Sequence, residues 1–282
     1  MSTRSSRLSI GYLIRIFWRR VSVTWSLTLM ETVTLAVLPL LIGRAIDGLL
    51  AGDWAPFHWL VGTMSVLLVL AVGRRIYDTR AYGAIRIAFG AAVVERAKEK
   101  PVSAINARLD MGREIVEFLE TEAPVVLTAV VQLAVSIAVL YSFHGTLAAA
   151  AGGAAVIAIL IYGASSRRFF SLNRALNQQV EKQVTVLKGG VAAALRHHLS
   201  ALRRHEVRLS DTEAVVYGLI FAVLLAMLSF NLWFAATQVG TSPGQIFSIV
   251  AYSFEFIESA VILPAALQSL TRISEITQRI NG

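Results

Sequence analysis

Residues 214–236 read AVVYGLIFAVLLAMLSFNLWFAA, a run without a single charged residue. A helix needs about 20 predominantly apolar residues to cross the hydrocarbon core of a bilayer. This run is therefore long enough to span a membrane as one helix. Further stretches on both sides of it have the same character, so the segment predicts the fold class of the whole molecule, an all-α integral membrane protein.

The composition of the 282 residues agrees with this prediction. Hydrophobic residues make up 56% of the chain and charged residues only 16%, whereas soluble domains carry about 45–50% and about 25%. A chain this apolar is neither an ordinary soluble domain nor a disordered one. It contains no cysteine, which excludes disulfides, iron–sulfur clusters and cysteine-based zinc sites.

We predict six spans within a single transmembrane domain, residues 1–282. The spans are 21–43, 56–79, 124–143, 146–165, 214–236 and 245–268. The sixth contains Glu255 and Glu258, but nearly all its other positions are apolar. We expect no cleavable signal peptide, because the first span is too long and lacks a small-residue cleavage site.

The distribution of the 26 lysines and arginines predicts the orientation. They gather before the first span, in 74–113, in 167–208 and after the last span, whereas the connectors 142–146 and 237–244 contain none. By the positive-inside rule, both termini and both long connectors face the cytoplasm. We expect a protein of a bacterial inner membrane. Because topology accounts for the net charge of +8, we expect no nucleic acid partner.

The two long connectors, 80–123 and 166–213, have apolar residues three or four positions apart, which is typical of amphipathic helices. We therefore predict that the neighbouring spans continue into the cytoplasm as two helical hairpins. Residues 101–112 would break the first hairpin. A turn near Gly189-Gly190, or in the region 197–205, would break the second.

Two long cytoplasmic hairpins among six spans resemble the membrane domain of type IV ABC exporters. The motif PLLIGRAID at 39–47 resembles the end of that family's first span. SPGQI at 242–246, followed by Pro264, resembles its sixth span, and TRISEI at 271–276 is similar to the helix that leads out of it. The resemblance implies the type IV exporter fold and a homodimer whose two copies enclose the transport pathway.

The sequence contains no G-x-x-x-x-G-K-[ST] motif to hold ATP phosphates, so we expect no ATPase domain and no cofactor. In this respect it resembles in principle the SbmA/BacA-type peptide transporters, which use an ion gradient. Three hypotheses stay open. We favour a proton-coupled transporter; the second is a subunit driven by a separate ATPase, which the resemblance would dock at 101–112 and 195–208; the third is a receptor or regulatory protein that does not transport.

Three glutamates fall near the middle of predicted spans. Glu31 and Glu255 each lie about 15 Å along their span at 1.5 Å per residue, and Glu258 is one turn further. A charged side chain at this depth is costly and tends to face a cavity or a partner. Because no Lys or Arg lies at the same depth in any span, we expect the glutamates to be unpaired. Glu255 and Glu258 repel each other when both are ionised, which favours proton uptake.

We therefore predict that these glutamates couple proton movement to transport or bind the substrate, a peptide, a peptide-like natural product or a cationic small molecule. Polar neighbours on the same helix faces, or on other spans, would line the cavity with them. These neighbours are Thr28, Tyr252, Gln132 and Asn231.

Other chemistry has little support. The sequence has no G-x-S-x-G, H-E-x-x-H or dinucleotide-binding motif, so we expect no enzyme activity and no catalytic residues. His197, His198 and His205 lie close together, but no carboxylate completes a metal-binding set at helical spacing. We expect no metal site.

Overall fold

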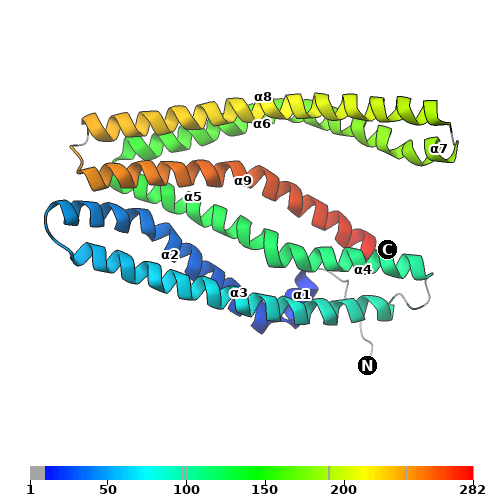
Figure 1. Ribbon diagram of the computed structural model, residues 1–282, viewed down its shortest axis with the longest axis horizontal. Helices are drawn as coiled ribbons and strands as arrows, with labels where there is room; N and C mark the ends of the chain where they lie inside the picture. Colours follow the sequence, from blue (N-terminus) through cyan, green and yellow to red (C-terminus); the bar gives the residue numbers. More distant parts are fainter. Residues whose placement is uncertain (1–9, 97, 99–100, 190, 239, 282) are drawn as a thin grey trace.

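The computed structural model describes residues 10–96, 98, 101–189, 191–238 and 240–281, and these are almost entirely helical (Figure 1). Six helices are long and apolar enough to cross a membrane, which confirms the predicted fold class. The elements are α1 (Ile10–Ile16), α2 (Trp18–Leu50), α3 (Ala55–Arg96), α4 (Val102–Glu117), η1 (Phe118–Glu122), α5 (Ala123–Phe143), α6 (Gly145–Glu181), α7 (Gln183–Lys188), α8 (Ala192–Gln238) and α9 (Pro243–Asn281).

Several helices extend well beyond the predicted spans. Helix α3 continues to Arg96, and α6 and α8 pack side by side along the upper edge of the bundle in Figure 1. The prediction that 101–112 interrupts the first hairpin is wrong, because α4 already begins at Val102, directly after Pro101. In the second hairpin α7 ends before Gly189, and 197–205 lies inside α8.

The molecule therefore has two distinct ends. At the short-loop end, α2 joins α3, α5 joins α6, and α8 joins α9 (Figure 1). At the hairpin end, α3 joins α4, and α7 joins α8. These two names are used below because they depend only on connectivity.

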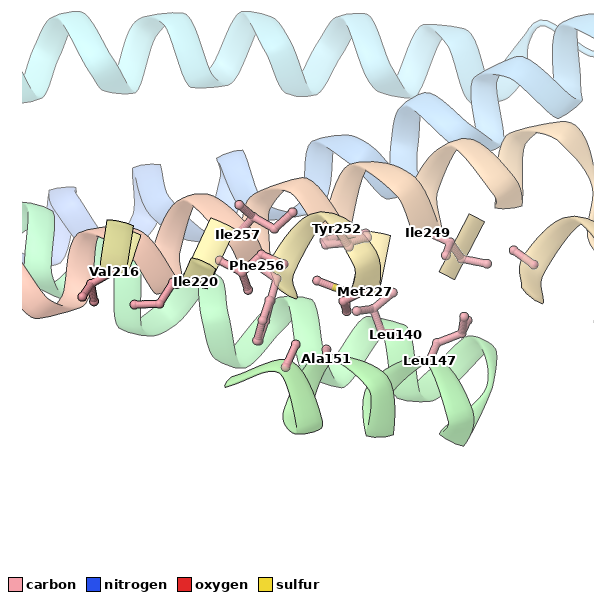
Figure 2. Packing of buried hydrophobic residues seen from close by; sticks show 13 residues of the cluster. Leu140, Leu147, Ala151, Val216, Ile220, Met227, Ile249, Tyr252, Phe256 and Ile257 are labelled. Carbon is pink, nitrogen blue, oxygen red and sulfur yellow. The ribbon is translucent and has the colours of Figure 1, made fainter. Parts of the chain in front are cut away.

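Two apolar cores hold the helices together. The first lies toward the short-loop end, where α5, α6, α8 and α9 contribute residues such as Leu140, Leu224 and Phe256 (Figure 2). The second lies toward the hairpin end, where Tyr82 and Phe89 of α3 pack with Ile115 of α4 and with residues of α1, α2 and η1. Neither core fills the space where α2 and α3 face α5 and α9.

Helices α2 and α9 meet closely at the short-loop end. The Asp47 carboxylate accepts hydrogen bonds from the Gly244 amide, at 2.8 Å, and from the Ser242 hydroxyl, at 2.5 Å. It thereby satisfies one free amide group at the start of α9, as an N-cap residue does. The Ser248 hydroxyl donates to the Pro39 carbonyl at 3.0 Å. We call this contact the α2–α9 joint.

The joint depends on two glycines. A Cβ atom at Gly43 would overlap Ser248 and the Gly244 backbone, and a Cβ atom at Gly244 would overlap the Gly43 carbonyl and Asp47. Small residues allow two membrane helices to approach until their backbones touch. The sequence motifs at 39–47 and 242–246 thus meet each other in space.

Helix η1 is one π-helical segment between α4 and α5. Pro124, in the first turn of α5, has no amide hydrogen, and its ring would clash with the carbonyl four residues earlier in a regular helix. The wider π turn accommodates it without ending the helix. As a result, α4, η1 and α5 form one continuous rod that carries Glu120 and Thr121 toward the space between the cores.

Candidate functional site

A cavity of about 640 Å³ lies between the two cores. Residues of α2, α3, η1, α5 and α9 line it, so every wall comes from a different part of the sequence. A volume of this size falls within the range of small-molecule sites, about 300–1,000 Å³. Five of the seven residues predicted to bind or couple line this cavity: Thr28, Glu31, Gln132, Glu255 and Glu258.

The α2 and α3 side carries a network of charges, which we call the paired wall. The Arg74 guanidinium forms an ion pair with the Glu31 carboxylate and a second one, at 3.3 Å, with Asp78. The expectation that Glu31 has no basic partner is therefore wrong. The sequence placed Arg74 near the cytoplasmic end of its span. However, α3 packs along α2, and the long Arg74 side chain reaches Glu31.

Asp78 completes this network from a buried position. Only 5% of its surface is exposed, and its Oδ1 atom has no hydrogen-bond partner among the described residues. One arginine thus serves two carboxylates, Glu31 and Asp78. If all three groups are charged, the paired wall keeps one net negative charge, since the single charge of Arg74 is shared between two carboxylates.

The α5 and α9 side differs, and we call it the open wall. Glu255 and Glu258 face the cavity from α9, and within the described part of the chain neither forms an ion pair with a basic side chain. The Gln132 side chain of α5 lies beside Glu255, but the Glu255 Oε2 atom is buried without a partner among the described residues. This wall therefore offers carboxylate oxygens to whatever occupies the cavity.

Threonines extend the polar lining. Thr28 is buried and donates its hydroxyl to the Thr24 carbonyl one turn earlier, at 3.0 Å. The hydroxyls of Thr32 and Thr128 share a hydrogen bond of 3.0 Å that links α2 to α5. Both of these threonines also line the cavity, so this bond ties the paired wall to the open wall beside the glutamates.

Two predicted cavity residues lie elsewhere. The Tyr252 hydroxyl donates to the Ala36 carbonyl at 2.7 Å, and the residue is 1% exposed. The Asn231 amide donates to the Ser253 hydroxyl at 2.9 Å and is fully buried. Each polar group instead links two helices, Tyr252 joining α9 to α2 and Asn231 joining α8 to α9. Neither lines the cavity.

The end of the cavity nearest η1 carries more charges. Glu120 forms an ion pair with Arg86 of α3 at 2.7 Å. Arg75, next to Arg74, lines the cavity and is exposed, and it has no ion pair among the described residues. Its guanidinium is the remaining cation of the lining once Arg74 is engaged.

Sequence reasoning missed several lining residues. Arg74, Arg75 and Glu120 were assigned to the ends of spans or to connectors, where charges are ordinary. Thr32 lies four residues after Thr28, so the helical repeat that selected Thr28 could also have selected it. Thr128 carries no such signal, because the pairing of α2 with α5 is not encoded in either segment alone.

No group of three metal-binding side chains occurs among the described residues. His198 is buried in α8 and shares a 3.1 Å hydrogen bond with Gln179 of α6. This contact joins the two extended helices near the hairpin end and explains the burial of a histidine there.

The chain was compared with known proteins. No curated protein matches it. A family model described as ABC transporter transmembrane region matches residues 12–244, which is most of the chain and includes α2, α3 and α5 with the cavity residues they carry. The six spanning helices and their long extensions agree with this match. The chain belongs to the family of ABC transporter transmembrane regions.

Proposed function

We propose that this transporter domain moves a peptide, a peptide-like natural product or a cationic small molecule across the membrane and couples that movement to protons. The observation that carries the proposal is the open wall. Two carboxylates of α9, Glu255 and Glu258, face a cavity within spanning helices and have no basic partner among the described residues. A carboxylate in this position can bind a proton or a substrate cation, and binding of one lowers the affinity for the other.

The cost of burying charge supports the coupling. A charged side chain near the centre of a bilayer is expensive unless it is paired or hydrated. Arg74 compensates Glu31 and Asp78, whereas protonation or a bound cation would compensate Glu255 and Glu258. Exchange of the two at the same oxygens would link proton movement to solute movement.

The proposal includes a homodimer with both termini in the cytoplasm. Lysines and arginines are concentrated around the hairpin end and the termini, in agreement with the positive-inside rule. Many large apolar side chains on α3, α6 and α8 are exposed in the single chain, and lipid or a second copy would cover them. The cavity of one copy is partly open, so a second copy could complete it.

A second candidate follows from the family itself. A membrane region of an ABC transporter is suited to a partner ATPase, and the helical surfaces at 101–112 and 195–208 lie at the hairpin end where such a partner could dock. In that case ATP hydrolysis supplies the driving force, and the carboxylates of the open wall select the substrate only.

Flux in proteoliposomes that contain only this protein separates these candidates. We expect an imposed pH gradient without ATP to drive uptake of a basic peptide or a cationic dye, and an uncoupler to abolish it. No flux across a substrate panel, followed by flux after addition of ATP and a cognate ATPase, would contradict proton coupling and favour the second candidate. Saturable binding without flux under either condition would favour a receptor.

A further inference from the structure

The cavity charges that have no ion pair among the described residues are of two kinds, and the helical rise places them at different levels. Glu255 and Glu258 offer negative charge on the open wall, and Arg75 is the cation that remains after Arg74 is engaged by Glu31 and Asp78. Glu120 is likewise engaged, by Arg86. The cavity is therefore not uniformly acidic, as a site for a simple cation would be.

The helical rise gives the separation of the two kinds of charge. Helices α3 and α9 both start at the short-loop end (Figure 1). Arg75 lies about 20 residues, or roughly 30 Å, from the start of α3, whereas Glu255 lies about 12 residues, or roughly 18 Å, from the start of α9. Glu258 lies roughly 22 Å from that start. The acidic and basic groups are thus offset by about 8–12 Å along the bundle axis, to which the width of the cavity adds.

We propose that the cavity is built for a zwitterion whose cationic group lies at Glu255 and Glu258 and whose anionic group lies at Arg75, at least about 10 Å away. This inference rests on the transport function proposed above and specifies its substrate class. An extended peptide advances about 3.3–3.6 Å per residue, so a free peptide needs at least three or four residues to reach both groups with its terminal ammonium and carboxylate.

The chemistry of each contact fits its partner. A guanidinium presents a planar fork of donors that matches a carboxylate, and two hydrogen bonds can form at once. The unpartnered Oε2 atom of Glu255 and the carboxylate of Glu258 can accept from an ammonium group. A zwitterion also compensates both ends of the cavity without carrying net charge across the membrane.

Three probes of one length isolate the two contacts. They are tetra-alanine, its C-terminal amide, which is only a cation, and its N-acetyl form, which is only an anion. Binding to the purified protein in nanodiscs at pH 7, with no gradient and no ATP, is measured by calorimetry. We expect the free peptide to bind about tenfold more tightly than either blocked form, because each blocked form loses one charge-assisted contact.

Variants assign the contacts. In Arg75→Gln the free peptide should lose its advantage over the amide but keep its advantage over the acetylated form. In the double variant Glu255→Gln, Glu258→Gln the free peptide should lose its advantage over the acetylated form but keep its advantage over the amide. Arg80→Gln is the matched control, since Arg80 is exposed, donates to the Ile76 carbonyl and does not line the cavity. If the glutamine variant is not recovered as a folded protein, Arg75→Lys replaces it. Lysine keeps the charge but loses the planar fork of donors, so the advantage of the free peptide over the amide should shrink.

The outcomes separate this inference from the proposed function. Equal or tighter binding of the amide to the unmodified protein would overturn the zwitterion, as would saturable binding of none of the probes. Preference for the free peptide without gradient-driven flux would leave the zwitterion in place and contradict proton-coupled transport. Gradient-driven flux of a simple cation with no preference for the free peptide would support proton-coupled transport and overturn the zwitterion.

Discussion

The carboxylates on the two sides of the cavity are held differently: Glu31, Glu255 and Glu258 line it, whereas Asp78 is buried beside it. On the paired wall, Glu31 and Asp78 share Arg74. On the open wall, Glu255 and Glu258 have no ion pair within the described residues, and Gln132 is the polar neighbour of Glu255. A place beside the same cavity therefore does not mean a similar role.

The difference has a physical consequence. Removing one member of a buried ion pair leaves an uncompensated charge, so such pairs resist change. The paired wall is expected to stay charged and to fix α2 against α3. The open wall lacks that constraint, and its charge can follow the occupant of the cavity.

The largest effect is expected for the double variant Glu255→Gln, Glu258→Gln. Gradient-driven flux should fall at least about 100-fold, because proton transfer by a positioned group contributes about 10²–10⁴-fold where it is required. Glu95→Gln is the matched control, since Glu95 pairs with Lys98 near the end of α3 and lies outside the cavity. Normal flux in the double variant would remove the open wall from the mechanism.

Arg74→Gln should affect stability more than any other single change in the paired wall. It leaves Glu31 and Asp78 without a cation, and we expect a loss of roughly 2–3 kcal/mol, below the value for fully buried pairs because Arg74 is partly exposed. Thermal unfolding in detergent measures it. The triple variant Glu31→Gln, Arg74→Gln, Asp78→Asn should recover most of the loss. No recovery would mean that packing, not charge, is responsible.

Gly244→Ala tests how the walls are held at the short-loop end. The added methyl group would overlap the Gly43 carbonyl and Asp47, so α9 must move away from α2 at a cost of about 1–3 kcal/mol. Spin labels at Leu50 and Thr241, both at this end, should report a longer distance than in the unmodified protein. An unchanged distance and melting temperature would show that the joint does not set the helix spacing.

The smallest effect is expected for Tyr252→Phe. It removes one buried hydrogen bond to the Ala36 carbonyl, so the protein should lose about 0.5–1.5 kcal/mol of stability. Flux should stay unchanged, because Tyr252 does not line the cavity. A large loss of flux with little loss of stability would instead support the original prediction that Tyr252 lines the transport path.

Hydropathy was sufficient to predict the six spans, since length and apolar character follow directly from the bilayer. Counting residues along the helices also predicted that Glu31, Glu255 and Glu258 share one level, because the helical rise is nearly constant. All three line one cavity, but the Arg74–Glu31 ion pair places Glu31 nearer the level of Arg74 than that of Glu255. These features are local to each segment, which is why the sequence carries them.

Features that depend on contacts between helices were beyond this reasoning. The Arg74 pairing requires knowledge of which face of α3 lies against α2. For Tyr252 and Asn231 the helix face was identified, but not the neighbouring helix that covers it, so hydrogen bonds between helices were taken for a cavity lining. The break of the first hairpin was placed too late, because the polar character of 101–112 suits a surface helix as well as a loop.

Proton movement measured with a pH-sensitive dye inside proteoliposomes tests the central claim most directly. The account predicts that a basic peptide, added without ATP, changes the internal pH in vesicles that contain the unmodified protein or Glu95→Gln, and not in vesicles that contain Glu255→Gln, Glu258→Gln. A pH change of the same size in the double variant, or peptide uptake with no pH change in the unmodified protein, would contradict it.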